Sequence, residues 1–280
     1  MNRLAVALAV VALLALPACD SPEFVDFPAG TTMHRLQHSG RIRIGVKADQ
    51  PSLGFLNPAT NQYEGFDVEL ATIVAAELGL SRKQITFVTT TSRVREDYLV
   101  QGRVDIVVAS YSMSDRRRAV VGQAGPYFKT GQQLLVRRAE KNVITGPEKI
   151  RGGRVCSVSG STSIDRWRQL YGTTPEIADN YTKCVQRLLT RSVDGVTTDG
   201  VVLLGYVAQL PTKLAVVGPE FSVDAYGIGY PKGDRALCDF LSGVITKVEH
   251  DGRWNKAFKE TLGQAAVAAP PKPAVEPCRD

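Results

Sequence analysis

Hydrophobic and polar positions alternate along the chain in short segments that predict strands and helices in regular succession. Residues 41–46 (RIRIGV) alternate polar and apolar side chains with the period of two that is typical of a strand. Residues 65–79 instead repeat apolar side chains every three to four positions and end in Gly79, which predicts an amphipathic helix. The next three segments predict a strand, a helix and a strand: QITFVTT, REDYLVQG and VDIVVAS. This βαβαβ succession predicts a parallel sheet covered by helices.

The pattern starts again after residue 131. Three further strands and four helical segments are expected: strands at 154–159, 193–198 and 213–218, and helices at 161–172, 182–192, 199–210 and 234–263. We therefore predict an α/β fold of two lobes with a cleft between them and strand-like hinges near residues 132–137 and 222–228. The expected division is residues 40–131 plus 226–263 for lobe 1, 132–225 for lobe 2, and 264–280 for a Pro-rich tail.

The first nineteen residues have the pattern of an export signal. Arg3 precedes an apolar run at residues 4–16 that is too short for a membrane-spanning helix. The sequence LPAC, ending at Cys19, resembles the lipidation site of a bacterial lipoprotein; an ordinary signal peptide with an incidental cysteine is the alternative. We expect the folded part to lie outside the cytoplasm, lipid-anchored through Cys19 to the outer face of the cell membrane, with residues 20–39 as a flexible spacer.

Composition narrows the class of protein. The chain has 280 residues, of which 44% are hydrophobic and 22% charged, and these values suit a globular protein of one or two domains. Its net charge of +6 could suggest a nucleic-acid partner, but Lys and Arg are scattered rather than clustered in a tract with interleaved aromatic residues. We therefore expect no nucleic-acid partner.

Export also affects the interpretation of the four remaining cysteines. An even number of cysteines in an oxidising compartment favours disulfides. We predict that Cys156 pairs with Cys184 and that Cys238 pairs with Cys278, which would hold the tail against the body; the other two pairings remain open. No CxxC arrangement occurs, so neither a redox site nor a metal site is expected, and no cofactor is required.

Three consecutive arginines at 116–118 follow a short apolar strand that ends in serines. They could form a solvated helix face, or one of them could point into the cleft and bind an anion. In the second half, SGSTSID follows a strand and opens a helix, so free amides near Ser161 and Thr162 could face the cleft. Asp199 likewise begins a helix. For these positions an ordinary helix cap is the alternative.

Six stretches carry a resemblance to a known family: IGVKADQPSLGF, GFDVELA, VDIVVASYSMSDRRRAVVGQAGPYF, GSTS, VDGVTTD and DGRWNKAF. From about residue 40 to 263 the chain resembles the extracytoplasmic solute-binding proteins of polar amino-acid ABC importers, in particular the actinobacterial glutamate-binding branch. The resemblance implies a two-lobed periplasmic-binding-protein-like fold of type II with two hinge strands. It also implies a monomer that binds an acidic amino acid, L-glutamate and then L-aspartate, and delivers it to ABC permease subunits.

The same resemblance assigns the residues that bind the ligand's α-groups. Arg117 matches the arginine that binds the α-carboxylate, which a guanidinium fork suits, and Ser112 matches a hydroxyl donor to the same group. The backbone carbonyl of Ser110 and the carboxylate of Asp199 match the acceptors of the α-ammonium group.

The side-chain end of the ligand is assigned in the same way. Lys47, Ser92 and Arg95 match positions that approach the distal carboxylate in relatives preferring acidic amino acids. Three donors, two of them cationic, favour a carboxylate over an amide, although glutamine and asparagine remain rivals. Whether Arg93 or Arg95 faces the pocket stays open. Gln50 lies where many relatives stack an aromatic ring on the ligand, and it either contacts the ligand or shapes the turn.

Two other function classes, an enzyme and a sensor, could use the same architecture. The same architecture is known to carry a few periplasmic lyases, but His34, His38 and His250 all lie outside the strand ends and no catalytic pattern is present, so no enzyme is expected. An amino-acid sensor for a membrane signalling partner would use the same binding chemistry and remains an alternative.

Overall fold

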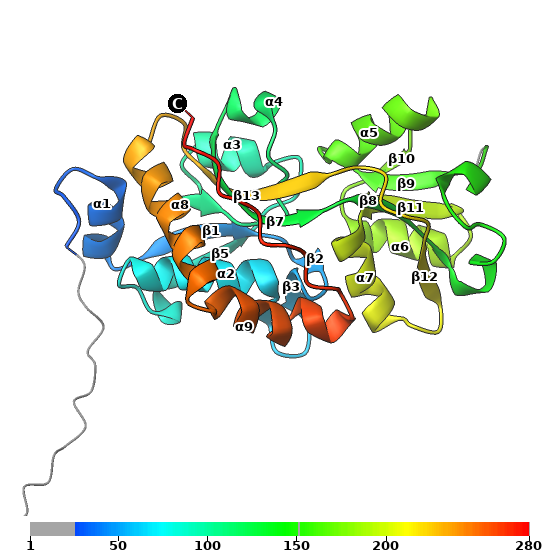
Figure 1. Ribbon diagram of the computed structural model, residues 1–280, viewed down its shortest axis with the longest axis horizontal. Coiled ribbons are helices and arrows are strands. Elements are labelled where there is room, and N and C mark those ends of the chain that lie inside the picture. Colours follow the sequence, from blue (N-terminus) through cyan, green and yellow to red (C-terminus); the bar gives the residue numbers. More distant parts are fainter. Residues whose placement is uncertain (1–25, 151, 280) are drawn as a thin grey trace, which may run out of the picture.

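Two five-stranded sheets, each flanked by helices, form two lobes that lie side by side (Figure 1). The structure is a computed structural model and describes residues 26–150 and 152–279. The first sheet has the order β5 (Ile85–Thr89), β1 (Ile42–Val46), β6 (Ile106–Val107), β13 (Asp224–Tyr230) and β7 (Gly122–Thr130). The second has the order β10 (Glu176–Ala178), β9 (Val155–Val158), β11 (Gly195–Asp199), β8 (Gln132–Arg137) and β12 (Leu214–Val217). The predicted two-lobed type II fold is thus confirmed.

A small antiparallel sheet and the helices complete the two lobes. The small sheet consists of β2 (Asp49–Gln50), β3 (Gly54–Asn57) and β4 (Gln62–Glu64). The first lobe carries α1 (Thr32–Ser39), α2 (Phe66–Glu77), α3 (Arg95–Val100), α4 (Asp115–Arg118), α8 (Arg235–His250) and α9 (Arg253–Glu260). The second carries α5 (Thr162–Tyr171), α6 (Tyr181–Leu189) and α7 (Gly200–Gln209). Short 3₁₀ helices are η1 (Arg82–Gln84), η2 (Arg138–Glu140), η3 (Pro147–Ile150) and η4 (Leu262–Ala265).

Parallel pairing determines which strand ends meet. Strand β1 pairs in parallel with β5 and β6, and β9 pairs in parallel with β10 and β11. Because parallel strands end at the same edge of a sheet, the loops after β1, β5 and β6 lie together in the first lobe. Those after β9 and β11 lie together in the second. Each sheet therefore presents one edge of loops and helix starts to the other lobe.

The chain crosses between the lobes twice, and both crossings lie next to strands near the predicted hinges. One crossing runs from β7 to β8 through Gly131, and the other runs from β12 to β13. The two crossings are hydrogen-bonded to each other, because Gln132 N donates to Ser222 Oγ (2.8 Å) and Phe221 N donates to Gln132 O (3.0 Å). A Cβ on Gly131 would lie 2.3 Å from Ser222 O, so only glycine fits this close approach.

Part of the predicted flexible spacer at residues 20–39 is a helix. Thr31 caps α1, Met33 and Leu36 are buried, and Thr32 Oγ1 donates to Asp234 Oδ2 at the start of α8 (2.6 Å). The spacer prediction is therefore wrong for residues 32–39, because their two apolar positions find a partner surface on α8 that lies far away in the sequence. The predicted signal and Cys19 lie outside the described residues. Among the described residues, no helix is long and apolar enough to cross a membrane.

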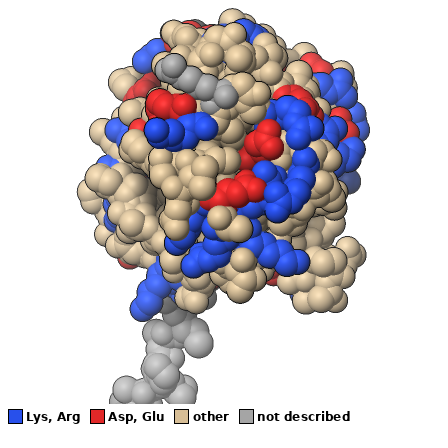
Figure 2. Space-filling view, turned by 90° about the vertical axis from the view of Figure 1, so that its right-hand side faces the viewer, with Lys and Arg blue, Asp and Glu red and all other residues tan. Residues whose placement is uncertain are grey.

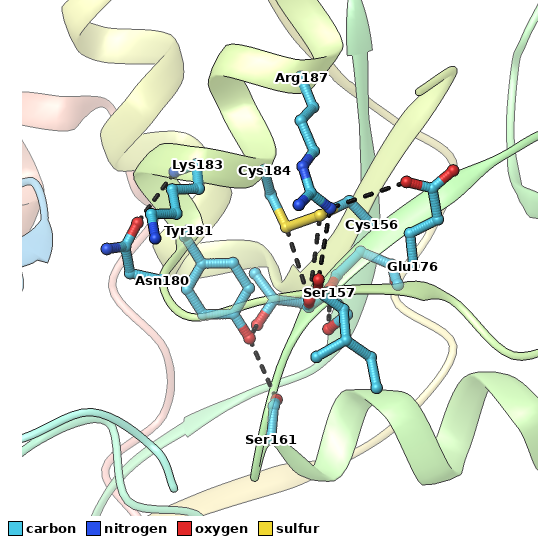
Figure 3. Close-up of a disulfide and its surroundings, with 12 residues drawn as sticks. Cys156, Ser157, Ser161, Glu176, Asn180, Tyr181, Lys183, Cys184 and Arg187 are labelled. Carbon is cyan, nitrogen blue, oxygen red and sulfur yellow. Dashed lines mark hydrogen bonds and ion pairs between the residues drawn. A yellow bond between two sulfur atoms is a disulfide. The ribbon is translucent and has the colours of Figure 1, made fainter. Parts of the chain in front are cut away.

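Both predicted disulfides form. Cys156–Cys184 joins β9 to α6, beside Tyr181 and Ser161 (Figure 3). Cys238–Cys278 joins α8 to the tail. The tail is extended and returns along the first lobe, where Glu276 N donates to Gly125 O (2.7 Å).

Removal of the second disulfide is expected to destabilise the protein. The bridge closes a segment with a sequence separation of 40, and the chain-entropy relation gives about 3 to 4 kcal/mol for a loop of that length. We expect Cys238→Ser/Cys278→Ser to lower the free energy of unfolding by this amount in urea titrations. An unchanged unfolding midpoint would show that this disulfide contributes nothing to stability.

Charge on the end of the second lobe is mixed. Figure 2 shows Lys and Arg side chains beside Asp and Glu on this face. Glu140 pairs with Arg137 (2.8 Å) and Arg191 (3.2 Å), and Asp194 pairs with Arg154 (3.8 Å). Much of the positive charge on this lobe is thus engaged in surface ion pairs.

Candidate functional site

Buried polar side chains gather where the strand ends of the two lobes face each other. Seven of the nine predicted ligand-binding residues are at most 8% exposed: Lys47, Ser92, Arg95, Ser110, Ser112, Arg117 and Asp199. Ser161 and Thr162 are half-buried at the start of α5. Charged side chains are rarely buried so completely unless a partner or a ligand compensates for the lost hydration. The structure therefore brings the predicted residues to one place.

Arg117 is the arginine of the triplet that points inward. It is 2% exposed, whereas Arg116 is exposed. Its Nη1 donates to Ser112 O (2.6 Å), its Nη2 donates to Gly160 O of the second lobe (3.1 Å), and its Nε lies 3.2 Å from Glu96 Oε1. The two hydrogen bonds use one N–H group of each terminal nitrogen, which leaves one free on each, and Nε has no hydrogen-bond partner among the described residues. Burial lowers the pKa of Arg117 to about 10, so it stays charged at neutral pH.

Arg95 also faces the interior, and this settles the choice between it and Arg93. Arg93 is exposed, while Arg95 is 2% exposed and its Nη1 donates to Ala109 O (2.9 Å). Its guanidinium carbon lies 4.1 Å from the ring centroid of Tyr111. The Nε of Arg95 has no hydrogen-bond partner among the described residues. A second buried cation is thus held next to Arg117 with a free donor.

Lys47 supplies a third buried cation at the end of β1. Its Nζ donates to Ser92 Oγ (2.8 Å). Burial, together with the nearby charge of Arg95, lowers the pKa of Lys47 to about 7. Beside Lys47 lies a cavity of about 290 Å³ that both lobes line, with Thr89–Thr91 on one side and Asp179–Thr182 on the other. This end of the site combines positive charge with space.

Asp199 supplies negative charge from the second lobe. It occupies the N-cap position of α7, but its side chain makes no capping hydrogen bond, so the plain cap role is excluded. Its Oδ2 accepts from the Tyr226 hydroxyl, and its Oδ1 has no partner among the described residues. Burial raises the pKa of Asp199, and the nearby charge of Asp224 raises it further. An unpaired buried carboxylate oxygen marks a place for a donor.

Of the two positions at the start of α5, only Thr162 reaches the first lobe. Thr162 Oγ1 lies 3.4 Å from Ser112 Oγ. The amide of Ser161 instead donates to Val158 O (3.0 Å), and its hydroxyl accepts from Ser163 N (3.2 Å). The prediction of a free amide at Ser161 is therefore wrong, because the tight turn after β9 uses that amide itself.

Asp67 is a site residue that the sequence analysis missed. Its buried carboxylate accepts from Ser110 N (2.7 Å) and from the Tyr127 hydroxyl (2.8 Å). Ser110 has a φ of 43°, a conformation that non-glycine residues rarely adopt. Asp67 thus fixes the direction of the Ser110 backbone. Its position in the first turn of a helix gave only a weak signal, since acidic residues are common there.

Gln50 is 1% exposed, and its Oε1 has no partner among the described residues. Together with Arg95 Nε and Asp199 Oδ1, it adds to the unpaired polar atoms of the buried site. Within residues 26–150 and 152–279, no group of three His, Cys, Asp or Glu side chains is arranged to hold a metal ion.

The site geometry and the fold agree with one family. The family model described as bacterial extracellular solute-binding proteins, family 3, matches residues 42–264. This chain belongs to that family. The family resemblance predicted from the sequence motifs is thus confirmed, and the matched residues include all nine predicted ligand-binding residues of this solute-binding protein.

Named relatives of the solute-binding protein cover most of its length. The glutamate-binding protein GluB of Corynebacterium efficiens is 33% identical, over 91% of this chain and 88% of the relative. The glutamine-binding protein GlnH of the Bacillus subtilis ABC transporter is 29% identical, over 91% of this chain and 94% of the relative. Among solved structures, an ancestral arginine-binding protein bound to arginine superposes with a TM-score of 0.72 at 29% identity, covering 79% of this chain and 98% of that one.

Proposed function

We propose that this solute-binding protein binds L-glutamate, and with lower affinity L-aspartate, outside the cytoplasm for delivery to the permease of an ABC importer. The observation that carries the proposal is the cluster of Lys47, Ser92 and Arg95 buried next to the Arg117 fork. Two separate groups of cationic donors suit a ligand with two carboxylates. The glutamate-binding relative supports the same ligand.

The α-groups of the amino acid are assigned to both lobes. The two remaining N–H groups of Arg117 bind the α-carboxylate as a fork, with Ser112 and Thr162 beside it. Asp199 Oδ1 and the Ser110 carbonyl accept from the α-ammonium group. These partners match the charges of a zwitterionic amino acid.

The distal carboxylate is assigned to Lys47, Ser92 and the Nε of Arg95. A glutamine side chain would place an amide against two cations, and within that set its NH₂ group would find only the second lone pair of Ser92 Oγ as an acceptor. This is the physical reason for preferring glutamate, even though a glutamine-binding relative exists.

Binding is proposed to proceed by hinge closure about the two crossings, with residues 40–131 plus 226–263 moving against 132–225. The ligand docks on Arg117, Ser112 and Lys47, and Thr162 and Asp199 then close over it. Contacts present only in the closed arrangement stabilise it relative to the open one. We further propose that the protein acts as a monomer without enzymatic activity and is anchored by a lipid on Cys19.

Calorimetric titration tests the proposal. Purified protein without the first nineteen residues is titrated with L-glutamate, L-aspartate, L-glutamine and L-asparagine. We expect one-to-one binding that is tightest for glutamate. Tighter binding of glutamine would assign the protein to the other branch, and no heat with any of the four would refute the proposed ligand class.

The pH dependence of affinity should differ between glutamate and glutamine. The pKa of Lys47 is lowered to about 7, so Lys47 is charged below that pH and loses its proton as the pH rises. The raised pKa of Asp199 means that this carboxylate is protonated as the pH falls, which weakens binding of the ammonium group. Glutamate affinity should therefore fall on both sides of neutrality, whereas glutamine affinity should fall only on the acid side. Titrations from about pH 6 to pH 9 measure this, and constant glutamate affinity above neutrality would contradict the Lys47 assignment.

A further inference from the structure

Asp49 connects the first lobe to two helices of the second. Its Oδ2 accepts from Tyr181 N, the first residue of α6, at 2.7 Å. Its backbone carbonyl accepts from the hydroxyl of Tyr206 on α7. The Tyr206 hydroxyl also lies 3.1 Å from Thr182 Oγ1, which holds it in place within the second lobe. One residue of the small sheet thus receives hydrogen bonds from both helices across the lobe boundary.

The start of α6 is suited to a carboxylate from outside its own lobe. The first turn of α6 contains no acidic residue, and the Asn180 side chain caps the helix by accepting from Lys183 N. Tyr181 N is bound instead by Asp49, whose negative charge lies at the positive end of the helix dipole. A hydrogen bond to an ionised acceptor is stronger than a neutral one. This contact is lost when the lobes separate.

The chemistry of Asp49 argues against direct recognition of the ligand. The two Asp49 oxygens that reach the lobe boundary, Oδ2 and the backbone carbonyl oxygen, already accept hydrogen bonds from the second lobe. On the basis of the proposed function, we infer that Asp49 is a positioning residue that stabilises the closed arrangement of the lobes. It thereby strengthens the binding of every ligand to the same extent.

A residue that acts only on lobe closure affects the binding of all ligands alike, whereas a residue that contacts the ligand side chain does not. Apparent affinity scales with the population of the binding-competent arrangement, so loss of a closure contact weakens all ligands by one common factor. Loss of a residue that touches the ligand side chain, such as Lys47, changes the ratio between ligands. Selectivity therefore separates the two roles.

The experiment compares Asp49→Ala and Asp49→Asn with the wild type, using Glu64→Ala as a matched control. Glu64 is an exposed carboxylate in β4 of the same small sheet, and it accepts hydrogen bonds from Asn57 Nδ2 (3.3 and 3.2 Å) within the first lobe. Its removal takes a negative charge from the same sheet without removing a contact to the second lobe. L-Glutamate, L-aspartate and L-glutamine are titrated into each variant, and hydrogen exchange of the Tyr181 amide is followed with and without ligand.

For Asp49→Ala we expect affinities about tenfold lower or weaker still, by an equal factor for all three ligands, and faster exchange of the Tyr181 amide. Asp49→Asn, which keeps an acceptor oxygen, should recover part of both effects, and Glu64→Ala should resemble the wild type. A changed ligand ratio in Asp49→Ala, or unchanged affinity, would overturn the inference. If the wild type binds none of the three ligands, the proposed function fails separately. The variants are then titrated with an amino acid from a wider screen that the wild type does bind, and equal affinities of wild type and Asp49→Ala for it would overturn the inference.

Discussion

Replacement of Arg117 by alanine is expected to abolish measurable glutamate binding. The two N–H groups that remain on its terminal nitrogens would form two charge-assisted hydrogen bonds with the α-carboxylate, each contributing about 1.5 to 3 kcal/mol. Their loss should weaken binding by about a hundredfold or more. Calorimetric titration measures the change, and thermal unfolding establishes that the variant is folded.

Two further variants make the Arg117 result specific. Arg116→Ala removes an identical but exposed charge from the same helical turn and should bind as the wild type does. Arg117→Lys keeps the charge and removes the fork, so we expect weak binding that does not reach the wild-type affinity. Wild-type affinity in Arg117→Ala would refute the assignment, and an equal loss in Arg116→Ala would reduce it to a general charge effect.

Gly205→Ala is expected to prevent full lobe closure without harming the fold. Gly205 lies in α7 of the second lobe, and a Cβ at this position would lie 2.2 Å from the carbonyl oxygen of Pro51 in the first lobe. The clash exists only when the lobes are together. Within an isolated helix, alanine is favoured over glycine by about 1 kcal/mol. The open protein should therefore be at least as stable as the wild type, while glutamate affinity falls about tenfold to a hundredfold.

Gly243→Ala is the matched control for this prediction. Gly243 lies in the interior of α8, and no heavy atom lies within 4 Å of the position that its Cβ would take. Both variants gain the same helix propensity, but only Gly205→Ala obstructs closure. Small-angle scattering of the ligand-saturated proteins should show a more extended Gly205→Ala. A closed form with unchanged affinity would show that Pro51 can move away at little cost.

The architecture was predictable because it depends on local pattern. Period-two and period-3.6 segments follow one another in βα order, and parallel pairing of such units requires helical crossovers. The disulfide partners were also predicted correctly. The wrong spacer prediction at α1 has a long-range cause. Met33 and Leu36 of α1 are buried because α8, some 200 residues later in the sequence, packs against them.

The sequence by itself determined which kinds of side chain stand at or beyond the strand ends: arginines after β6, a lysine after β1 and an aspartate as the last residue of β11. It could not decide which members of each group face the cleft. Adjacent residues of a helical turn point about 100° apart, so the choice of Arg117 over Arg116 depends on how α4 sits on the sheet. Only the tertiary structure decided that, as it decided Arg95 over Arg93.

Long-range partners were equally beyond the sequence pattern. Asp67 fixes Ser110, 43 positions away, and Asp49 meets Tyr181, 132 positions away. Local periodicity carries information over a few turns of helix or strand, whereas these contacts arise from how the two sheets are placed against each other. The sequence thus determined the lobes and the chemistry available at their edges. The packing of one lobe against the other decided which of those groups form a buried site and which hold it closed.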